Sequence, residues 1–506
     1  MTKQKGGALM STFRFAESSG MPIYRQLENG IRKMILDGNL SAGDRLPSSR
    51  QLATDLGISR QTVKNVFEQL TIEGFLNSRR GSGTFVGDVA VMKLPPEMPR
   101  DRRRLNGYRV QPSKHARAIA ATKATTRLGS VAAFRPGVPA LDMFPRKAWS
   151  AAHSRVMRSG NDILFSYGPP GGLPELKRAI RLHVRDHRGI RCDEDQIVVT
   201  AGAQQAFVLI ALTLIKSGSV VWCEDPGHIA VRDAMRLLCA DVKHVPVDRH
   251  GFDLEYARQR HPRARLIFVT PSHQHPLGIT MSLNRRLELL DSAQQHGCWI
   301  VEDDYDSEFR YAERALPAMQ ALDGSGHVLY VGSFSKSLFP ALRIGYLISP
   351  PGLVDAFAAA QTLLSQNVSP LQQQVLASFM LDGSFNAHIR NMCTLYRRRR
   401  DLLVQGLRQH AGSFLDIEPC LAGMHLIGWL RDGTANELVA AEAIRSAGID
   451  CLPLSIYCVE QVLRPGILFG FACVPDSEIN AATRVVGAAM ADALHGGRHN
   501  VPPRQH

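Results

Sequence analysis

The chain has 506 residues, more than one ordinary domain holds and enough for a large core plus a smaller module. Hydrophobic residues make up 44% and charged residues 21%, which is typical of globular proteins, and no apolar run is long enough to cross a membrane. The net charge of +14 favours a polyanionic partner. The start lacks the apolar segment of a secretory signal, and the scattered cysteines form no Cys-x-x-Cys pair. We therefore expect a cytoplasmic protein without a bound metal.

A small helical unit is expected near the start of the chain. Residues 23–38 have the period of an amphipathic helix, whose apolar face would consist of Ile23, Leu27, Ile31 and Ile35. Ser48 can cap a second helix that ends at Gly57, and Ser59 can cap a third. This rhythm is that of a helix-turn-helix, and its core would contain Leu52, Leu56, Val63, Val66 and Leu70.

A basic β-hairpin is expected directly after these helices, because Arg79-Arg80-Gly81-Ser82-Gly83 separates two β-rich runs. Together with the helices, it resembles the winged helix-turn-helix domain of the GntR regulators over nearly its whole length. The resemblance implies binding to double-stranded DNA. The candidate DNA contacts are Arg50, Ser59, Arg60, Gln61, Thr62, Lys64, Arg79, Arg80 and Gly81. The alternative is a helical dimerisation cap whose arginines are merely solvated.

The segment 89–128 is expected to be a basic linker. It carries ten Lys or Arg against two acidic residues, and several prolines discourage regular structure. It could be a solvated tether or could touch DNA phosphates. We therefore expect a winged helix-turn-helix over 20–88, the linker over 89–128, and a large domain over 129–495.

Short β-rich runs alternate with helical patterns across residues 195–350. Strands are expected at 196–200, 219–223, 242–247, 265–270, 298–303, 328–331 and 345–348, with helices at 204–215, 229–238 and 284–296 between them. This alternation predicts an α/β domain with a mostly parallel sheet and helices on both faces. Ligands of such sheets bind at the carboxyl ends of the strands.

Several residues with complementary chemistry follow those strands. Lys336 lies in Val-Gly-Ser-Phe-Ser-Lys-Ser-Leu and can form an imine with an aldehyde cofactor. Asp303 can keep a pyridine nitrogen protonated, and Tyr305 can hydrogen-bond the oxygen on the ring. Arg343 and nearby hydroxyls can bind a phosphate. Together these are the parts of a pyridoxal-phosphate site.

From about residue 130 the chain resembles a fold type I aminotransferase, and the combination with the winged helix resembles the MocR family of bacterial transcription regulators. The similar blocks include Tyr-Gly-Pro-Pro-Gly-Gly-Leu at 167–173, Thr-Pro-Ser-His-Gln at 270–274 and Glu-Asp-Asp-Tyr-Asp-Ser-Glu-Phe at 302–309. The resemblance implies a covalent bond from the cofactor to Lys336, and an obligate homodimer. The other cofactor contacts that it implies are Asp303, Tyr305, Ser333, Ser335, Arg343, Gly202, Ala203, Gln204, His228 and, from the partner subunit, Tyr167.

The chain departs from the aminotransferase pattern at three positions. Leu468 stands where the substrate's carboxylate usually meets an arginine, and Ala230 stands where a GABA-responsive relative can carry one. His275 replaces an asparagine that touches the cofactor ring oxygen. Asp304, Asp306 and Glu308 are expected to form a solvated or helix-capping cluster.

Two functions fit these observations. The first is a transcription regulator in which pyridoxal phosphate, free or joined to an amine effector, changes the DNA binding of a dimer. The second is an active aminotransferase with an accessory DNA-binding module. The missing arginine and asparagine favour the regulator, with a residual transamination half-reaction still open.

Overall fold

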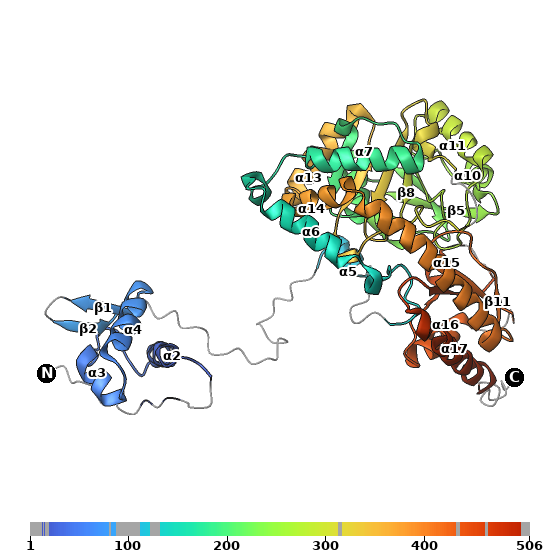
Figure 1. Ribbon diagram of the computed structural model, residues 1–506. Coiled ribbons are helices and arrows are strands. Elements are labelled where there is room, and N and C mark those ends of the chain that lie inside the picture. Colours follow the sequence, from blue (N-terminus) through green and yellow to red (C-terminus); the bar gives the residue numbers. More distant parts are fainter. Residues whose placement is uncertain are drawn as a thin grey trace. The chain divides into compact units, whose positions relative to one another are not determined.

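The protein is described by a computed structural model, and the described residues are 13, 15, 20–79, 82–87, 112–121, 132–311, 316–431, 436–460 and 464–496. The chain divides into two compact units, residues 1–113 and 114–506, which are coloured from blue to red along the sequence in Figure 1. Each unit has a hydrophobic core of its own, so each is described by itself.

The smaller unit is a helix-turn-helix followed by a hairpin, as the sequence predicts. Its elements are α2 (Ile23–Leu36), α3 (Ser49–Leu56), α4 (Arg60–Ile72), β1 (Leu76–Arg79) and β2 (Gly83–Val86). Both predicted caps form: Ser48 Oγ accepts from Gln51 N at 3.2 Å, and Ser59 Oγ accepts from Thr62 N at 3.0 Å. Gly57 ends α3 in the left-handed conformation, at φ 67°.

The predicted core of the smaller unit is largely confirmed. Leu52, Val63, Val66 and Leu70 are buried, and Leu56 is partly buried against them. Ile23 is different, since it is 49% exposed. It lies in the first turn of α2, one turn before the buried residues of that helix, so it does not share the burial of the other members of the predicted apolar face.

The hairpin pairs Leu76 with Val86 and Arg79 with Gly83 in antiparallel register. Arg79 lies over the ring of Phe85, with its guanidinium carbon 5.5 Å from the ring centroid. Two of the predicted DNA contacts, Arg80 and Gly81, lie outside the described residues.

One helix forms where the sequence predicts an irregular linker: α5 spans Lys114–Ala121. Proline discourages helix at its own position and before it, but Pro112 precedes α5 and leaves it intact. The run Ala116–Ala121 is rich in alanine, the best helix former, which accounts for the difference.

The larger unit is built on a mostly parallel sheet, as predicted. Within the described residues the strand order is β3-β10-β9-β8-β7-β4-β5-β6. The strands are β3 (Ile197–Thr200), β4 (Val220–Asp225), β5 (Asp241–Asp248), β6 (Gly251–Phe252), β7 (Leu266–Val269), β8 (Trp299–Asp304), β9 (Val328–Ser333) and β10 (Gly345–Ile348). β4 pairs in parallel with β5 and β7, as do β7 with β8 and β8 with β9, whereas β10 is antiparallel to β3 and β9.

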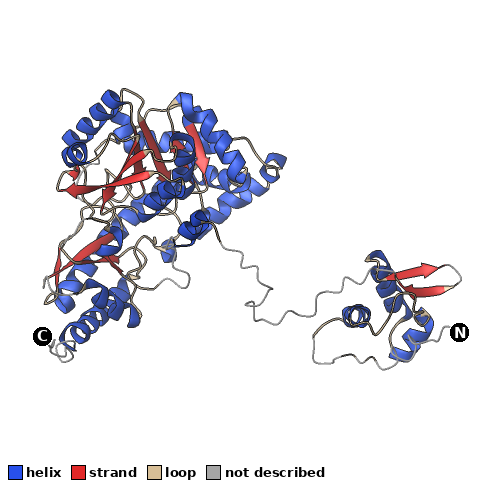
Figure 2. Ribbon diagram, turned by 180° about the vertical axis from the view of Figure 1, so that it is seen from behind, coloured by secondary structure: helices blue, strands red, loops and turns tan. Residues whose placement is uncertain are grey.

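Helices cover both faces of this sheet (Figure 2). Successive side chains of a strand point to opposite faces of the sheet. Ile197 and Val199 of β3 therefore pack in one hydrophobic cluster, and Val198 packs in another with α8 and α13. The helices are α6 (Arg146–Met157), α7 (Pro174–Arg188), α8 (Ala203–Leu214), α9 (Ile229–Leu237), α10 (Leu254–Arg260), α11 (Leu283–His296), α12 (Met319–Leu322), α13 (Val354–Ser365) and α14 (Pro370–Leu381).

A smaller antiparallel sheet, in the order β11-β12-β14-β13, completes the larger unit. Its strands are β11 (Leu415–Ile417), β12 (His425–Leu430), β13 (Leu452–Pro453) and β14 (Gly466–Gly470). The long helix α15 (Ser384–Ala411) packs against α17 (Asp476–Gly496), and α16 (Glu437–Ser446) also packs on α17. β12 and β14 bring residues from the last quarter of the chain to the carboxyl ends of the large sheet, where the predicted site lies.

Candidate cofactor site

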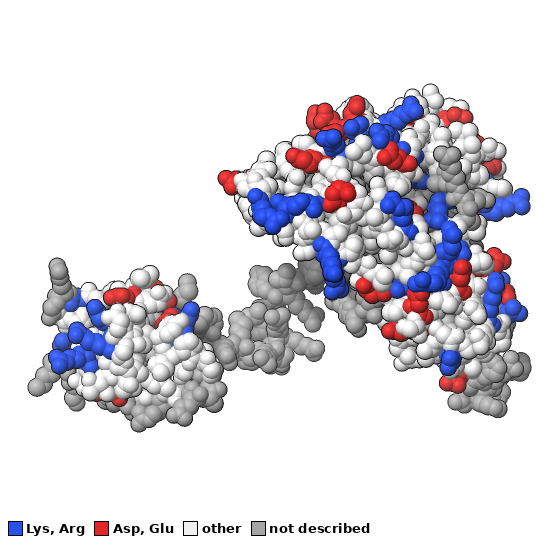
Figure 3. Space-filling model, viewed as in Figure 1, with Lys and Arg blue, Asp and Glu red and all other residues white. Residues whose placement is uncertain are grey.

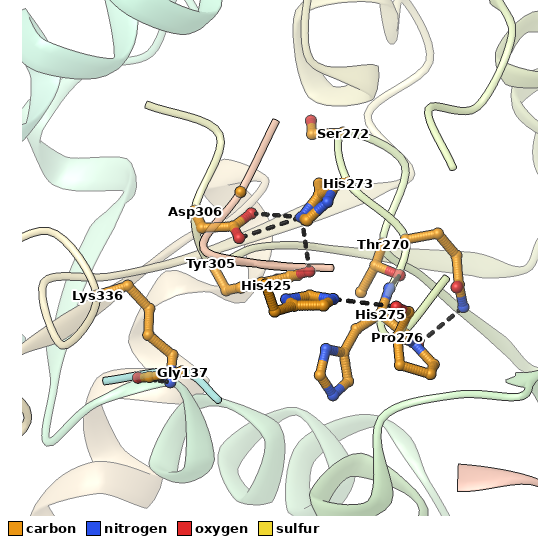
Figure 4. A network of polar contacts seen from close by, with 12 residues as sticks. Gly137, Thr270, Ser272, His273, His275, Pro276, Tyr305, Asp306, Lys336 and His425 are labelled. Carbon is orange, nitrogen blue, oxygen red and sulfur yellow. Dashed lines mark hydrogen bonds and ion pairs between the residues drawn. The ribbon is translucent and has the colours of Figure 1, made fainter. Parts of the chain in front are cut away.

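Lys336 follows β9 and extends into the pocket shown in Figure 4, where its Nζ donates a hydrogen bond to the Gly137 carbonyl oxygen at 2.7 Å. Gly137 has φ 75°, and a Cβ there would lie 2.6 Å from that Nζ. The backbone of the segment Phe-Arg-Pro-Gly-Val-Pro, residues 134–139, can approach the amine only because this residue is glycine. Burial lowers the pKa of Lys336, so the neutral, nucleophilic amine is easier to reach.

Asp303 lies near the end of β8 and is only 3% exposed. Burial raises its pKa well above the ordinary value, and the carboxylates of Asp304 and Glu224 raise it further, whereas Lys336 lowers it. A buried carboxyl with a raised pKa is stabilised in its ionised form by a partner that carries a positive N–H group. The protonated nitrogen of a pyridine ring is such a partner.

A candidate phosphate cradle forms where α8 begins. Gly202 is the N-cap at φ 90°, and no side chain caps the helix, so the N–H groups of the first turn face outward. Arg343 donates to the Ala201 carbonyl oxygen at 2.7 Å, and its guanidinium lies 3.1 Å from where a Cβ on Gly202 would be. Arg343 holds a left-handed φ of 51°, which is unusual for a residue with a side chain and is typical of functional sites.

The remaining predicted phosphate contacts lie on the same side of the sheet. Ser333 ends β9, antiparallel to Gly345, and its Oγ accepts from Ser335 N at 3.2 Å. Ala203 and Gln204 form the first turn of α8, and Gln204 Nε2 donates to the Ala230 carbonyl oxygen at 3.4 Å. The structure thus brings backbone donors, hydroxyls and one guanidinium to the carboxyl ends of β3 and β9.

His228 and His275 line the pocket as neighbouring rings, with centroids 5.4 Å apart. Burial lowers the pKa of His228 to about 4, and the charge of Lys336 acts in the same direction. Burial also lowers the pKa of His275 well below its ordinary value, with added repulsion from His228 and His425. Both imidazoles are therefore neutral near pH 7, which suits stacking against an aromatic ring.

Tyr305 is hydrogen-bonded inside the protein. Its hydroxyl oxygen lies 3.0 Å from His273 Nδ1, and that nitrogen is also 3.1 Å from Asp306 Oδ2 and 3.2 Å from Asp306 Oδ1 (Figure 4). His425 on β12 is buried beside them, and its Nε2 lies 3.0 Å from the Pro276 carbonyl oxygen. The sequence reasoning did not select His273, Asp306 or His425, although two of them lie within the similar blocks.

His273, Asp306 and His425 place one ligand-type atom each within 4.8 Å of one another. Imidazole and carboxylate are common metal ligands, so these three residues form a candidate metal site, whereas the sequence predicted no bound metal. The observed hydrogen bonds already use His273 Nδ1 and both oxygens of Asp306.

Asp304, Asp306 and Glu308 were predicted to form a solvated or helix-capping cluster, and the prediction of solvation is wrong: two of the three are buried, and all three face cations or imidazoles. Asp304 Oδ2 lies 2.6 Å from Arg188 Nε and accepts from the Tyr330 hydroxyl at 2.6 Å. Asp306 contacts His273, and Glu308 lies 3.5 Å from His183 Nε2. These carboxylates follow β8 into the interior, where burial requires partners.

Within the described part of the chain, no guanidinium stands free at the place where the aminotransferase pattern has its carboxylate-binding arginine, as Leu468 and the neighbouring Arg464 show. Leu468 on β14 is fully buried in a cluster with Ile427, Leu454 and Tyr457. Arg464, the nearby alternative, forms an ion pair with Asp416 and donates to the Leu430 carbonyl oxygen at 3.0 Å. Neither residue offers a guanidinium for a carboxylate at this place.

Tyr167 is 76% exposed. Its carbonyl oxygen accepts from Asn367 Nδ2 at 3.0 Å, which fixes the backbone. The structure of one chain therefore does not bring its side chain together with the other predicted contacts.

Most of the predicted DNA contacts of the smaller unit lie at the start of α4, with Arg50 on α3 and Arg79 on β1. Arg50, Arg60, Gln61 and Lys64 are exposed, whereas the Ser59 and Thr62 hydroxyls hydrogen-bond each other at 2.8 Å. On the face in view in Figure 3, Lys and Arg side chains of this unit gather at one side. Arg45 was not selected from the sequence, yet its backbone bridges to Phe85 of the hairpin.

Comparisons with known proteins identify both units. Residues 23–86 match the family "Bacterial regulatory proteins, gntR family", and residues 139–485 match "Aminotransferase class I and II". The chain is 38% identical to the probable rhizopine catabolism regulatory protein MocR of Rhizobium meliloti, over 89% of this chain and 90% of that one. It is 30% identical to the HTH-type pyridoxine biosynthesis transcriptional regulator PdxR of Corynebacterium glutamicum, over 93% and 96% of the two chains.

Solved structures agree on the fold of the larger unit. Kynurenine aminotransferase of Pyrococcus horikoshii matches with a TM-score of 0.66 and 24% identity, over 72% of this chain and 92% of that one. LysN, an α-aminoadipate aminotransferase of Thermus thermophilus, matches with a TM-score of 0.66 and 23% identity, over 76% and 96%. Among the described residues, no helix is long and apolar enough to span a membrane.

Proposed function

The chain belongs to the MocR family of transcription regulators, with a GntR-type winged helix-turn-helix and an aminotransferase-like domain, and we propose that pyridoxal phosphate bound at Lys336 controls its binding to promoter DNA. The observation that carries this proposal is the pocket around Lys336. It joins a buried amine of lowered pKa, a buried carboxyl of raised pKa and an uncapped helix start beside a guanidinium.

The residues fit the cofactor group by group. When bound, pyridoxal phosphate supplies an aldehyde that reacts with primary amines and a ring that accepts electrons. Lys336 would hold it covalently, Asp303 would accept from its ring nitrogen, and Tyr305 would donate to its ring oxygen. Arg343, Ser333, Ser335 and the α8 start would bind its phosphate, and His228 would stack on its ring.

The proposed signal is pyridoxal phosphate itself, or an amine without an α-carboxylate contact. Catalytic turnover needs the substrate anchored so that the bond being broken stands correctly over the ring. Leu468 and its apolar neighbours offer no charged anchor there. A ligand can alter DNA affinity only by preferring one arrangement of the protein, and this requires binding but no turnover.

A homodimer is part of the proposal. Tyr167 is exposed on its own chain, on a backbone held by Asn367. An exposed tyrosine at this place is available to the cofactor phosphate of a partner subunit. Tyr167→Phe should then weaken cofactor binding in the dimer without changing the folding of one chain.

Absorption spectra and DNA binding of the full-length protein test the proposal together. Wild type should show a bound-cofactor band and a borohydride-trappable adduct, and operator affinity should differ between apo and loaded protein. Lys336→Ala should lose the adduct, while Lys177→Ala, a lysine on α7, should keep it. Multiple turnover with an amino acid and a keto acid, combined with equal operator affinity of the apo and loaded protein, would favour the aminotransferase instead.

A further inference from the structure

We propose that His273 and Asp306 are positioning residues that fix the direction of the Tyr305 hydroxyl hydrogen, so that it is presented to the pocket. The inference rests on the proposed function, because the acceptor in the pocket would be the ring oxygen of pyridoxal phosphate. Neither residue needs to touch the cofactor.

The argument starts from one nitrogen with two neighbours. His273 Nδ1 lies 3.1 Å from Asp306 Oδ2 and 3.0 Å from the Tyr305 oxygen. An ionised carboxylate can only accept hydrogen bonds, so Nδ1 must carry the hydrogen in this contact. A nitrogen that carries a hydrogen cannot accept one from Tyr305. The Tyr305 oxygen is therefore an acceptor toward His273, and its own hydrogen points elsewhere.

The other ring nitrogen supports the same tautomer. His273 is 2% exposed, and its Nε2 has no hydrogen-bond partner among the described residues. Placing the hydrogen on Nε2 would bury an unpaired N–H and would also set the lone pair of Nδ1 against a carboxylate. With the hydrogen on Nδ1, the only unsatisfied group is the lone pair of Nε2. Leaving one acceptor unpaired costs less free energy than burying an unpaired N–H and also placing the Nδ1 lone pair against a carboxylate.

The phenolic hydrogen has two preferred positions, both in the plane of the ring. His273 Nδ1 lies against the hydroxyl oxygen, so the hydrogen takes the position away from His273. In the proposed function, the ring oxygen of the cofactor is the acceptor at that position. The ring of His275 packs edge-on against Tyr305, with its centroid 5.6 Å from that of Tyr305. The other titratable groups that act on Tyr305 are Asp306, Asp303, Glu224 and Tyr457, and substitution of His273 leaves all of them in place.

Two substitutions at His273 without an added charge separate this role from packing. Asparagine places an amide N–H near the Nδ1 position, whereas leucine removes the donor. The measurement is the pH midpoint at which the absorption band of the bound cofactor titrates. A donor to the ring oxygen stabilises its negative charge and eases proton loss, so losing that donor raises the midpoint. His273→Asn should titrate like wild type, and His273→Leu should titrate about one pH unit higher.

Combining the substitutions at His273 and Tyr305 tests whether His273 acts through the Tyr305 hydroxyl. In the Tyr305→Phe background, His273→Leu should cause no further shift, because the hydroxyl it orients is gone. Equal midpoints for His273→Leu and His273→Asn, or additive shifts with Tyr305→Phe, would overturn the inference. If His273→Leu does not fold, His273→Gln gives the same comparison, since its amide reaches the Nε2 position and leaves Nδ1 empty.

Two further outcomes are distinguishable. A wild-type protein that forms no cofactor band contradicts the proposed function itself, before any variant is compared. Stoichiometric zinc in the purified protein that is lost in His425→Gln would show that His273, Asp306 and His425 hold a metal, which would overturn the hydrogen-bond assignment.

Discussion

The two units place their charges differently. Around the start of α4, Arg60 and Lys64 lie exposed in water, where keeping a charge costs little. In the larger unit, Asp303 and Asp304 are almost completely buried: burial and Asp304 raise the pKa of Asp303, whereas Arg188 helps to hold the pKa of Asp304 below its usual range. Exposed charges can be read by a partner without a role in folding, whereas buried charges hold the fold and the chemistry at once. Substitutions in the first region should change binding, and those in the second should change stability.

The largest effect should come from the buried pair Arg188–Asp304. Burial alone would raise the pKa of Asp304, but Arg188 and two hydroxyl donors outweigh it and hold that pKa below its usual range. Arg188→Met leaves a buried carboxylate without its cation and should lower the free energy of unfolding by about 3–5 kcal/mol. Denaturant unfolding of the apo protein measures this.

Arg178→Met is the matched control, since Arg178 is exposed on the same helix α7. It should change stability by less than about 0.5 kcal/mol. Similar losses for Arg178→Met and Arg188→Met would remove the distinction between exposed and buried charges that the two regions suggest.

The second-largest effect is a dependence of the free energy of unfolding on pH, caused by His425. Burial lowers its pKa in the folded protein to about 4, whereas the unfolded value is near 6.5. The unfolded chain thus binds a proton first as pH falls, so stability from this group is complete above about 6.5 and is lost toward 4. His425→Gln keeps a donor near Nε2 for the Pro276 carbonyl oxygen. Between pH 7 and 4 the variant should gain up to about 3 kcal/mol relative to wild type in denaturant unfolding of the apo protein.

A relative stability that does not change between pH 7 and 4 would mean that His425 is not the neutral, buried group described. Burial also raises the pKa of Glu224 to about 7, which makes its contribution fall as pH rises. The comparison therefore uses the difference between variant and wild type, in which the effect of Glu224 cancels.

The same contrast explains what the sequence could predict. The helix-turn-helix caps at Ser48 and Ser59 and the strands on either side of Lys336 depend on local patterns, and these predictions agree with the structure. Asp306 and His273 are 33 residues apart, and His425 comes from another sheet. Their meeting depends on how the start of β12 lies against the segments that follow β7 and β8, which no spacing in a single sequence encodes. Asp304 was expected in a solvated or helix-capping cluster because its cation, Arg188, is over 100 residues away in the sequence.

The third effect belongs to DNA binding. Arg60→Ala should weaken operator binding by about 1–3 kcal/mol if Arg60 reads a base, and less if it meets only phosphate. Lys64→Ala should weaken specific and non-specific DNA alike and reduce the salt dependence of binding. Fluorescence anisotropy with the promoter of its own gene measures both. Lys33→Ala on α2 removes one exposed charge from the same unit and should change affinity less; unchanged affinity in the Arg60/Lys64 double variant would exclude α4 as the reading helix.

The smallest effect separates two roles of Ser59. Its Oγ accepts from Thr62 N, so Ser59→Ala should lower the stability of the smaller unit by about 1 kcal/mol. Ser59→Asp keeps a capping oxygen and should keep that stability, but it adds a negative charge where DNA phosphate is expected, so it should weaken operator binding. Ser48→Ala removes the equivalent cap of α3 and serves as the control, since it should lower stability with little change in affinity measured well below the melting temperature. If Ser59→Asp binds DNA as tightly as wild type, the start of α4 does not face the phosphates, and its exposed charges have no nucleic-acid partner there.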